Sequence, residues 1–207
     1  MMKKIVSLCL MAAVLSIPAS AVVIGDWESG LDGWIDWSGA ATTMAGGQSE
    51  GVTLGTGSLL VEQSGYGQSL AIQLDAAQRA AFMASSTFSI DMSVAATEGI
   101  TEGYTQIHTV SMNAAGPGWT DVATDTPINF YWWDGRPDET QTLEIDYSAF
   151  RDQITSTGYI EIIFALNTGG GAPEQMYFDN AQLTGVPEPA TLSLLGLGAI
   201  ALLRRKR

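Results

Sequence analysis

The sequence predicts an all-β domain in which two antiparallel sheets pack face to face as a sandwich. Segments of alternating apolar and polar residues recur through the second half of the chain, which is the pattern of half-buried strands. Clusters of Gly and Pro separate these segments, as at Gly116-Pro117-Gly118 and at residues 169–173. Only one segment favours a helix. Short strands, frequent turns and little helix favour a jelly roll over an immunoglobulin-like topology.

The first predicted elements of the domain lie before residue 87. Two short apolar runs, residues 51–55 and 57–64, are candidate strands. Residues 74–84 are rich in Ala, which favours helix, and Asp75 is placed to accept a hydrogen bond from the first turn. We therefore expect one short helix over this segment.

Six further segments are predicted strands. In residues 87–96 the apolar side chains from Phe88 to Val94 alternate with polar ones from Ser89 to Ser93. Residues 106–113 repeat the pattern, with Ile107, Thr109 and Ser111 expected on one face and His108, Val110 and Met112 on the other. The remaining four segments are residues 127–133, 141–147, 159–167 and 175–185.

The N-terminus has the pattern of a secretory signal peptide. Lys3 and Lys4 precede an apolar stretch over residues 5–17, and the small residues Ala19-Ser20-Ala21 follow. We expect the Sec translocon to export the chain and signal peptidase to remove residues 1–21. The alternative, an ordinary core helix, leaves the adjacent charges and the small-residue site unexplained. The single cysteine lies inside this segment, so the mature chain is expected to contain no disulfide.

The predicted domain, residues 22–185, is strongly acidic. It contains 21 acidic and three basic residues, which gives a net charge of −18. Such a charge repels the phosphate backbone and argues against nucleic-acid binding. With one histidine and no cysteine, a transition-metal site rich in these ligands is excluded, whereas clustered carboxylates favour divalent cations such as calcium.

The C-terminal segment, residues 186–207, combines three features. Residues 190–203 are apolar except for a Thr and a Ser, a length more typical of a buried or interfacial helix than of a full span. Four cations follow directly and favour a short transmembrane helix, because they are expected to stay on the cytoplasmic side as a basic stop: Arg204, Arg205, Lys206 and Arg207. Before it, Pro187 and Pro189 cannot continue a helix, so Pro187-Glu188-Pro189 is expected to be extended and accessible to a membrane enzyme.

This tail, VPEPATLSLLGLGAIALLRRKR, resembles the PEP-CTERM sorting signal in the order and position of its three parts. The resemblance implies that Pro187, Glu188 and Pro189 form the sorting motif recognised by an exosortase-type processing enzyme. It also implies a Gram-negative bacterium, many of which make extracellular polysaccharide. The precursor would be anchored in the inner membrane and the processed protein would reach the cell surface or the extracellular matrix.

The domain between these ends resembles carbohydrate-binding-module-like jelly rolls of the galactose-binding type. The likeness lies in GDWESGLDGW at residues 25–34, GTGSLLVEQ at residues 55–63 and MYFDNAQLTG at residues 176–185. It implies a structural Ca²⁺ with Glu28 and Asp179 as side-chain ligands, a role consistent with the oxygen ligands that calcium prefers. The alternative is that Glu28 is a solvated loop residue and Asp179 an ordinary turn or strand-edge residue.

Four aromatic residues are candidates for stacking on sugar rings: Trp119, Tyr131, Trp132 and Trp133. Trp132 and Trp133 are neighbours on a predicted strand and therefore point to opposite faces, so at most one lies in the core. The alternative for each ring is core packing, since Trp is highly buried on average.

No catalytic residues are expected, and we predict that the protein is not an enzyme. His108 is the only histidine, and no nucleophile elbow accompanies it. The sequence therefore favours an exported, non-catalytic protein with a carbohydrate-binding-like sandwich. A structural or adhesive module without sugar affinity is an alternative, and a secreted glycoside hydrolase using two carboxylates is the remaining one.

Overall fold

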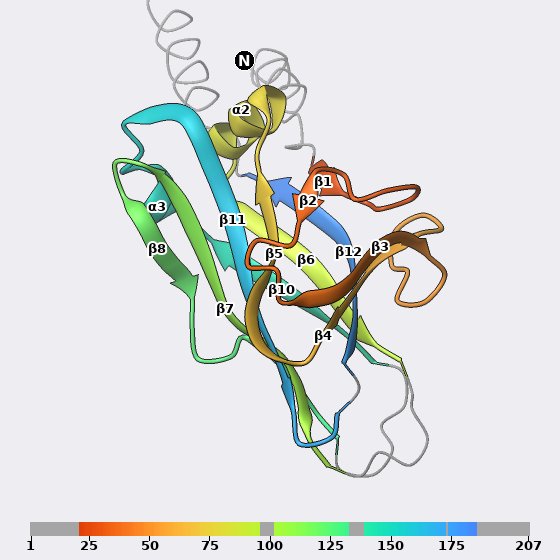
Figure 1. Ribbon diagram of the computed structural model, residues 1–207. Coiled ribbons are helices and arrows are strands. Elements are labelled where there is room, and N and C mark those ends of the chain that lie inside the picture. Colours follow the sequence, from red (N-terminus) through yellow and green to blue (C-terminus); the bar gives the residue numbers. More distant parts are fainter. Residues whose placement is uncertain (1–20, 96–101, 133–138, 173, 186–207) are drawn as a thin grey trace, which may run out of the picture.

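A computed structural model describes residues 21–95, 102–132, 139–172 and 174–185 of the chain. In these residues two six-stranded antiparallel sheets pack face to face, which confirms the predicted β-sandwich (Figure 1). Sheet A has the strand order β10-β6-β12-β4-β3, and β1 pairs with β12. Sheet B has the order β2-β5-β11-β7-β8, and β9 pairs with β7. The C-terminal strand β12 therefore lies at the centre of sheet A.

The strands of sheet A are β1 Val22–Gly25, β3 Ala41–Gln48, β4 Ser58–Gln63, β6 Thr87–Val94, β10 Glu139–Asp146 and β12 Gln175–Thr184. Those of sheet B are β2 Trp34–Ile35, β5 Gly65–Gln73, β7 Tyr104–Ala115, β8 Gly118–Ala123, β9 Ile128–Tyr131 and β11 Ser156–Gly169. Two helices, α2 Ala76–Ala84 and α3 Ser148–Arg151, complete the described elements.

Most of the predicted elements are confirmed. All six alternating segments contain a strand, and the predicted helix is α2. Asp75 caps α2 as expected, because its side chain accepts from the backbone N–H of Gln78 while Gln78 accepts from Asp75 in return. The candidate strand at residues 51–55 is wrong, since that segment is a loop. Five strands were not predicted: β1, β2, β3, β5 and β8.

Strand β7 also departs from the predicted alternation. Its pairing with β11 shifts register between Leu166 and Ala165, which lie opposite Ile107 and Thr109. His108 is the extra residue of this bulge and is exposed. As a result Ile107 faces the core together with Val110 and Met112, instead of opposite to them as predicted.

The core lies between the two sheets and includes large aromatic residues. Trp34 is fully buried, and its ring lies 5.6 Å from that of Trp27 and 6.0 Å from that of Phe164, measured between centroids. The Trp34 indole N–H donates to the carbonyl of Ile24 at 3.0 Å, so its polar atom is satisfied inside the core.

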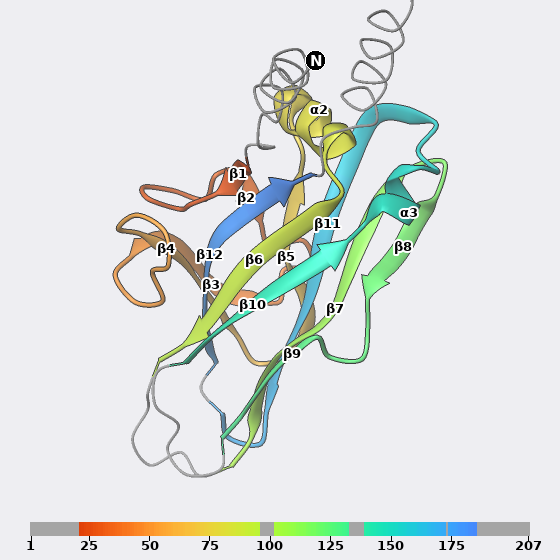
Figure 2. The same cartoon turned by 180° about the vertical axis from the view of Figure 1, so that it is seen from behind.

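The two helices close one end of the sandwich (Figures 1 and 2). Phe82 of α2 stacks on Tyr147, which precedes α3, with ring centroids 4.1 Å apart. The Tyr147 hydroxyl donates to the carbonyl of Phe82, and burial raises the pKa of this hydroxyl well above its usual range. In the described part of the chain no helix is long and apolar enough to cross a bilayer. The predicted signal peptide and tail helix lie outside the described residues.

The position of Trp34 gives the first testable prediction. Trp34→Ala should lower the free energy of unfolding by about 3–5 kcal/mol, because it removes a fully buried ring from a packed core. Trp37→Ala is the matched control, since Trp37 is 42% exposed and its loss should change stability by less than about 0.5 kcal/mol. Denaturant unfolding measures both, and equal effects would contradict the described core.

Candidate functional site

The predicted site residues fall into two separate regions of the sandwich. Trp119 on β8 and Tyr131 on β9 belong to sheet B, whereas Glu28 and Asp179 lie against the loop that joins β3 to β4 on the side of sheet A. The two regions have different surroundings.

On sheet B the strand register aligns the outward side chains into rows across the strands. One row joins Gln73 on β5, Glu161 on β11, Asn113 on β7 and Trp119 on β8. The Asn113 amide donates to a carboxylate oxygen of Glu161 at 2.8 Å. These side chains point away from the core because the residues that alternate with them, such as Met112 and Ile162, are core residues.

The side chains of the next row are mostly buried. It joins Ala71, Ile163, Ser111 and Asp121, and the first three are buried although they face outward. Ala71 and Ser111 are small, and they lie on either side of the larger Ile163. The Ser111 hydroxyl donates to Asp121 at 2.6 Å.

A third row, nearer the other end of sheet B, is rich in amides. It joins Tyr66, Asn167, Gln106 and Asn129, and the Asn167 amide donates to the Gln106 carbonyl oxygen at 3.3 Å. The side-chain oxygen of Asn129 is buried and has no hydrogen-bond partner among the described residues. The bulge residue His108 contacts Tyr66 edge to face, with ring centroids 5.5 Å apart.

Beyond this row Tyr104 pairs with Tyr131, so Tyr131 marks the far end of the face. Along β7 the nine steps from Tyr104 to Asn113, which is paired with Trp119, correspond to about 30 Å. We call the surface made by these rows the outer face of sheet B. It presents exposed rings at both ends and amides, carboxylates and small residues between them.

All five exposed aromatic side chains of the described residues belong to sheet B or to the turn after β2. Tyr66 is 58% exposed, Tyr131 45% and Trp119 44%, and the other two are Trp37 and Tyr159. The turn that holds Trp37 runs beside β5, because the backbone N–H of Ser38 donates to the carbonyl of Gln68. Single exposed apolar side chains are ordinary on a protein surface, whereas several exposed rings in one region indicate a binding surface.

Trp132 corrects the sequence prediction. It is fully buried, and its indole N–H donates to the Thr105 hydroxyl at 3.0 Å, so its ring is not available for stacking. Trp133 lies outside the described residues. The sequence did not indicate Tyr66, Gln106, Asn129 or Asn167 as site residues. No local motif marks them, because they meet only through the pairing of four strands.

In the second region, three acidic side chains outside the loop between β3 and β4, residues 49–57, hold that loop by hydrogen bonds. We call Glu28, Asp91 and Asp179 the clamp. Buried Asp179 accepts from the backbone N–H groups of Thr53 and Leu54, both at 2.6 Å. Asp91 lies opposite Asp179 on β6 and accepts from the Thr53 hydroxyl at 2.6 Å. This loop therefore covers part of the outward face of sheet A.

Glu28 holds the same loop two residues further on. Its carboxylate accepts from the backbone N–H of Thr56 at 2.7 Å and from the Thr56 hydroxyl at 2.5 Å. These bonds lower the pKa of Glu28, so their contribution to stability is present above the ordinary Glu pKa and is lost as the pH falls through the lowered value. Burial raises the pKa of Asp179 despite its hydrogen bonds. The charged carboxylate is therefore disfavoured in the folded protein, and this unfavourable contribution to stability diminishes as the pH falls through the raised pKa.

The surroundings of Glu28 and Asp179 do not fit a calcium ion. Calcium takes oxygen ligands, whereas the oxygens of both carboxylates face N–H and O–H donors from the loop. No group of three or more His, Cys, Asp or Glu side chains is placed to hold a metal in the described residues. The calcium site that the resemblance implies is tested by the effect of Ca²⁺ and chelator on the melting temperature.

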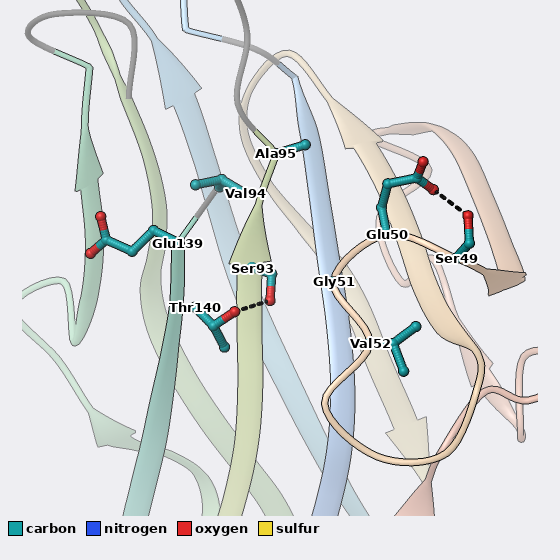
Figure 3. A pocket seen from close by; sticks show the side chains of 9 residues that line it. All are labelled: Ser49, Glu50, Gly51, Val52, Ser93, Val94, Ala95, Glu139 and Thr140. Carbon is teal, nitrogen blue, oxygen red and sulfur yellow. Dashed lines mark hydrogen bonds between the residues drawn. The ribbon is translucent and has the colours of Figure 1, made fainter. Parts of the chain in front are cut away.

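A polar pocket of about 360 Å³ lies between the first residues of this loop and the β6–β10 edge of sheet A. Glu50 lies on the loop and Glu139 on β10, with their carboxylates directed away from each other, while Ser93 and Thr140 between them are joined by a hydrogen bond of 2.7 Å (Figure 3). It contains none of the predicted site residues.

Comparisons with known proteins assign the tail and the fold. The PEP-CTERM protein-sorting motif matches residues 185–207, which confirms the predicted sorting signal. The comparison with curated proteins gave no match.

Among solved structures, a CBM27 carbohydrate-binding module of Caldicellulosiruptor saccharolyticus, determined with mannohexaose, is similar with a TM-score of 0.53 and 12% identity. The alignment covers 80% of this chain and 97% of that one. A xylan-binding domain of family CBM22 has a TM-score of 0.50 and 15% identity, over 82% of this chain and 96% of the other. At these identities the likeness shows the fold, a β-sandwich of the kind found in carbohydrate-binding modules.

The clamp gives the second prediction. Asp179→Ala should lower the free energy of unfolding by about 1–3 kcal/mol, because it leaves two loop N–H groups without their acceptor. The melting temperature of the unsubstituted protein and the size of this loss should be the same in Ca²⁺ and in chelator. Calorimetry measures both. A melting temperature that rises with Ca²⁺ in the unsubstituted protein but not in Asp179→Ala would instead establish the calcium site.

Proposed function

We propose that this protein is an exported, non-catalytic component of the cell surface or extracellular matrix that binds polysaccharide on the outer face of sheet B. The observation that carries the proposal is that four of the five exposed aromatic side chains of the described residues belong to sheet B, and the fifth, Trp37, lies in the turn beside β5. The sandwich fold, shared with carbohydrate-binding modules, and the sorting motif at residues 185–207 support it.

The outer face of sheet B has the chemistry that a glycan chain requires. The rings of Tyr66, Trp119 and Tyr131 offer flat apolar surfaces to the apolar faces of sugar rings. The amides of Gln106 and Asn167 both donate and accept, which suits hydroxyl groups. With about 30 Å between the end residues, the face is long enough for several successive sugars along the strands.

Charge narrows the class of polysaccharide. Lys and Arg do not occur among the described residues of sheet B, whereas Asp121 stands beside Trp119 on β8 and Glu161 lies in the same row as Trp119, two strands away. The domain as a whole carries a net charge of −18. A polyanionic glycan would be repelled by this surface, so neutral or amino-bearing chains are the expected ligands.

Delivery follows from the two ends of the sequence. Residues 1–21 would act as the signal peptide, and residues 186–207 would hold the precursor in the inner membrane with the basic stop in the cytoplasm. An exosortase-type enzyme would then process the chain at Pro187-Glu188-Pro189. The domain between them, residues 22–185, would be released from this anchor to the surface of a Gram-negative cell.

Two alternatives remain within the same delivery route. The sandwich could serve as a structural or adhesive module without sugar affinity, in which case substitutions on the outer face of sheet B would leave every glycan interaction unchanged. A glycoside hydrolase would need two carboxylates that face each other across a cleft, whereas Glu50 and Glu139, the two that line the polar pocket, point away from each other (Figure 3). Turnover of chromogenic glycosides by the purified protein would establish this alternative.

Binding gives the third prediction. Trp119→Ala and Tyr66→Ala should each weaken binding of the best ligand on an array of neutral, amino-bearing and uronic glycans by about tenfold, or roughly 1.4 kcal/mol. Leu54→Ala is the matched control, because Leu54 is also exposed but lies on the clamp loop over sheet A. Titration calorimetry with the best ligand gives the affinities. Equal affinities in all four proteins would refute the assignment of this face.

Processing gives the fourth prediction. Mass spectrometry of the protein from cells that contain the processing enzyme should find Val22 at the new N-terminus and should not find Arg207. Changing Pro187-Glu188-Pro189 to three alanines should retain the tail. Secreted, membrane-independent protein that still ends at Arg207 would contradict the anchored precursor.

A further inference from the structure

The polypeptide enters and leaves the sandwich at one end. In the antiparallel pairing of β1 with β12, Val22 lies opposite Leu183, so the first and last residues of the domain are neighbours. Both views of the ribbon show the start of β1 and the end of β12 at the end that carries α2 (Figures 1 and 2). The two segments predicted to contact the membrane therefore join the domain side by side.

The exit of the chain is held firmly against α2. Thr184 pairs with Thr87, and its carbonyl accepts from the backbone N–H of Ser86 at 3.0 Å. A Cβ atom on Gly185 would lie 2.9 Å from the carbonyl oxygen of Ala84, so residue 185 is pressed against the C-terminal end of the helix. Gly185, the last described residue, is therefore fixed against the domain.

Most of the residues exposed on α2 and β1, at this end of the sandwich, are small and apolar. On α2 the exposed residues are Ala76, Ala77, Ala80 and Ala84, and the one carboxylate at this helix is its exposed N-cap, Asp75. Val22 and Val23 are also exposed, at 37% and 41%, on the strand that packs beside the helix. We call these six residues the α2 cap. The cap differs from the rest of this acidic domain, whose carboxylates are spread over both sheets and the clamp loop.

The length of the connection places the α2 cap relative to the membrane. Only four residues, 186–189, separate Gly185 from Ala190, where the apolar run begins. Fully extended, the connection from Gly185 to Ala190 spans at most about 18 Å. The headgroup layer on each side of the hydrocarbon core takes up about 5–8 Å of this length. Gly185 therefore lies within about 13 Å of the headgroups once the tail is inserted, a distance close to the diameter of one helix.

We propose that the α2 cap lies against the lipid headgroups while the tail anchors the precursor. In both views the helix stands beyond the end of β12, at the same end of the sandwich as the start of β11 (Figures 1 and 2). Bacterial headgroups include anionic lipids, and α2 with its N-cap carries one cation, Arg79, against one carboxylate, Asp75, so it meets less repulsion there than the acidic remainder of the domain. Glycan binding is not required for this contact, but insertion of the tail is.

The absence of cysteine from the mature chain makes a direct test possible, since a single introduced cysteine takes one label. The full chain from Val22 to Arg207 is reconstituted in vesicles of phosphatidylethanolamine and phosphatidylglycerol that contain a headgroup-level quencher. One variant carries a fluorescent label at Ala80→Cys in the cap. The matched control carries it at Ser64→Cys, an exposed residue in the turn before β5, whose nine residues separate it from α2 by about 30 Å.

We expect quenching at Ala80→Cys to exceed that at Ser64→Cys several-fold, and a Gly-Ser linker inserted after Gly185 to reduce the difference. Equal quenching at the two positions in vesicles that float with bound protein overturns the contact of the cap. Protein that does not float with the vesicles overturns the contact together with insertion of the tail. Quenching at Ala80→Cys that appears only when the processing enzyme is added assigns the cap to that enzyme and overturns the lipid contact. None of these outcomes depends on glycan binding.

Discussion

The whole sandwich depends on the position of its last strand. β12 pairs with β6 on one side and with β4 on the other, and β1 joins it further along. Without β12, sheet A would fall into two separate pairs, β10 with β6 and β4 with β3. The clamp has the same requirement, because Asp179 of β12 holds a loop more than a hundred residues earlier. The fold can therefore close only when the chain has been translocated as far as the sorting motif.

The outward face of sheet A is partly covered by a loop, whereas the outward face of sheet B is exposed. On sheet A, Asp91 and Asp179 bind the loop of residues 49–57 against the sheet, and the polar atoms there form hydrogen bonds within the protein. On sheet B the described residues include no such loop, and the amides and carboxylates pair within the rows while the rings of Tyr66 and Trp119 stay exposed. Only sheet B keeps a broad surface of mixed aromatic and polar character.

The sequence predicted elements with a local pattern, and it did not predict features that arise only when the strands assemble into sheets. β6 alternates throughout and β10 alternates in its second half, and both were found, whereas β3 and β5 are rich in Gly, Ala, Ser and Thr and give no periodic signal. The bulge at His108 reversed the predicted faces of β7, since one extra residue shifts the alternation. Likewise, adjacency limited Trp132 and Trp133 to one core position between them, but it could not tell that Trp132 takes it. The role of Asp179 depends on a partner 126 residues away.

The strand direction links the attachment of the domain to its proposed binding. The outer face of sheet B runs along β7 and β11, from the row of Trp119 near the helices to Tyr131 at the opposite end. A domain held at the α2 cap would therefore extend this face away from the membrane instead of covering it. Removing the tail would leave Val22 and the region of Gly185 as neighbouring ends on that same cap. Attachment through either end would then keep the entire face available, because no strand of sheet B contributes to the point of attachment.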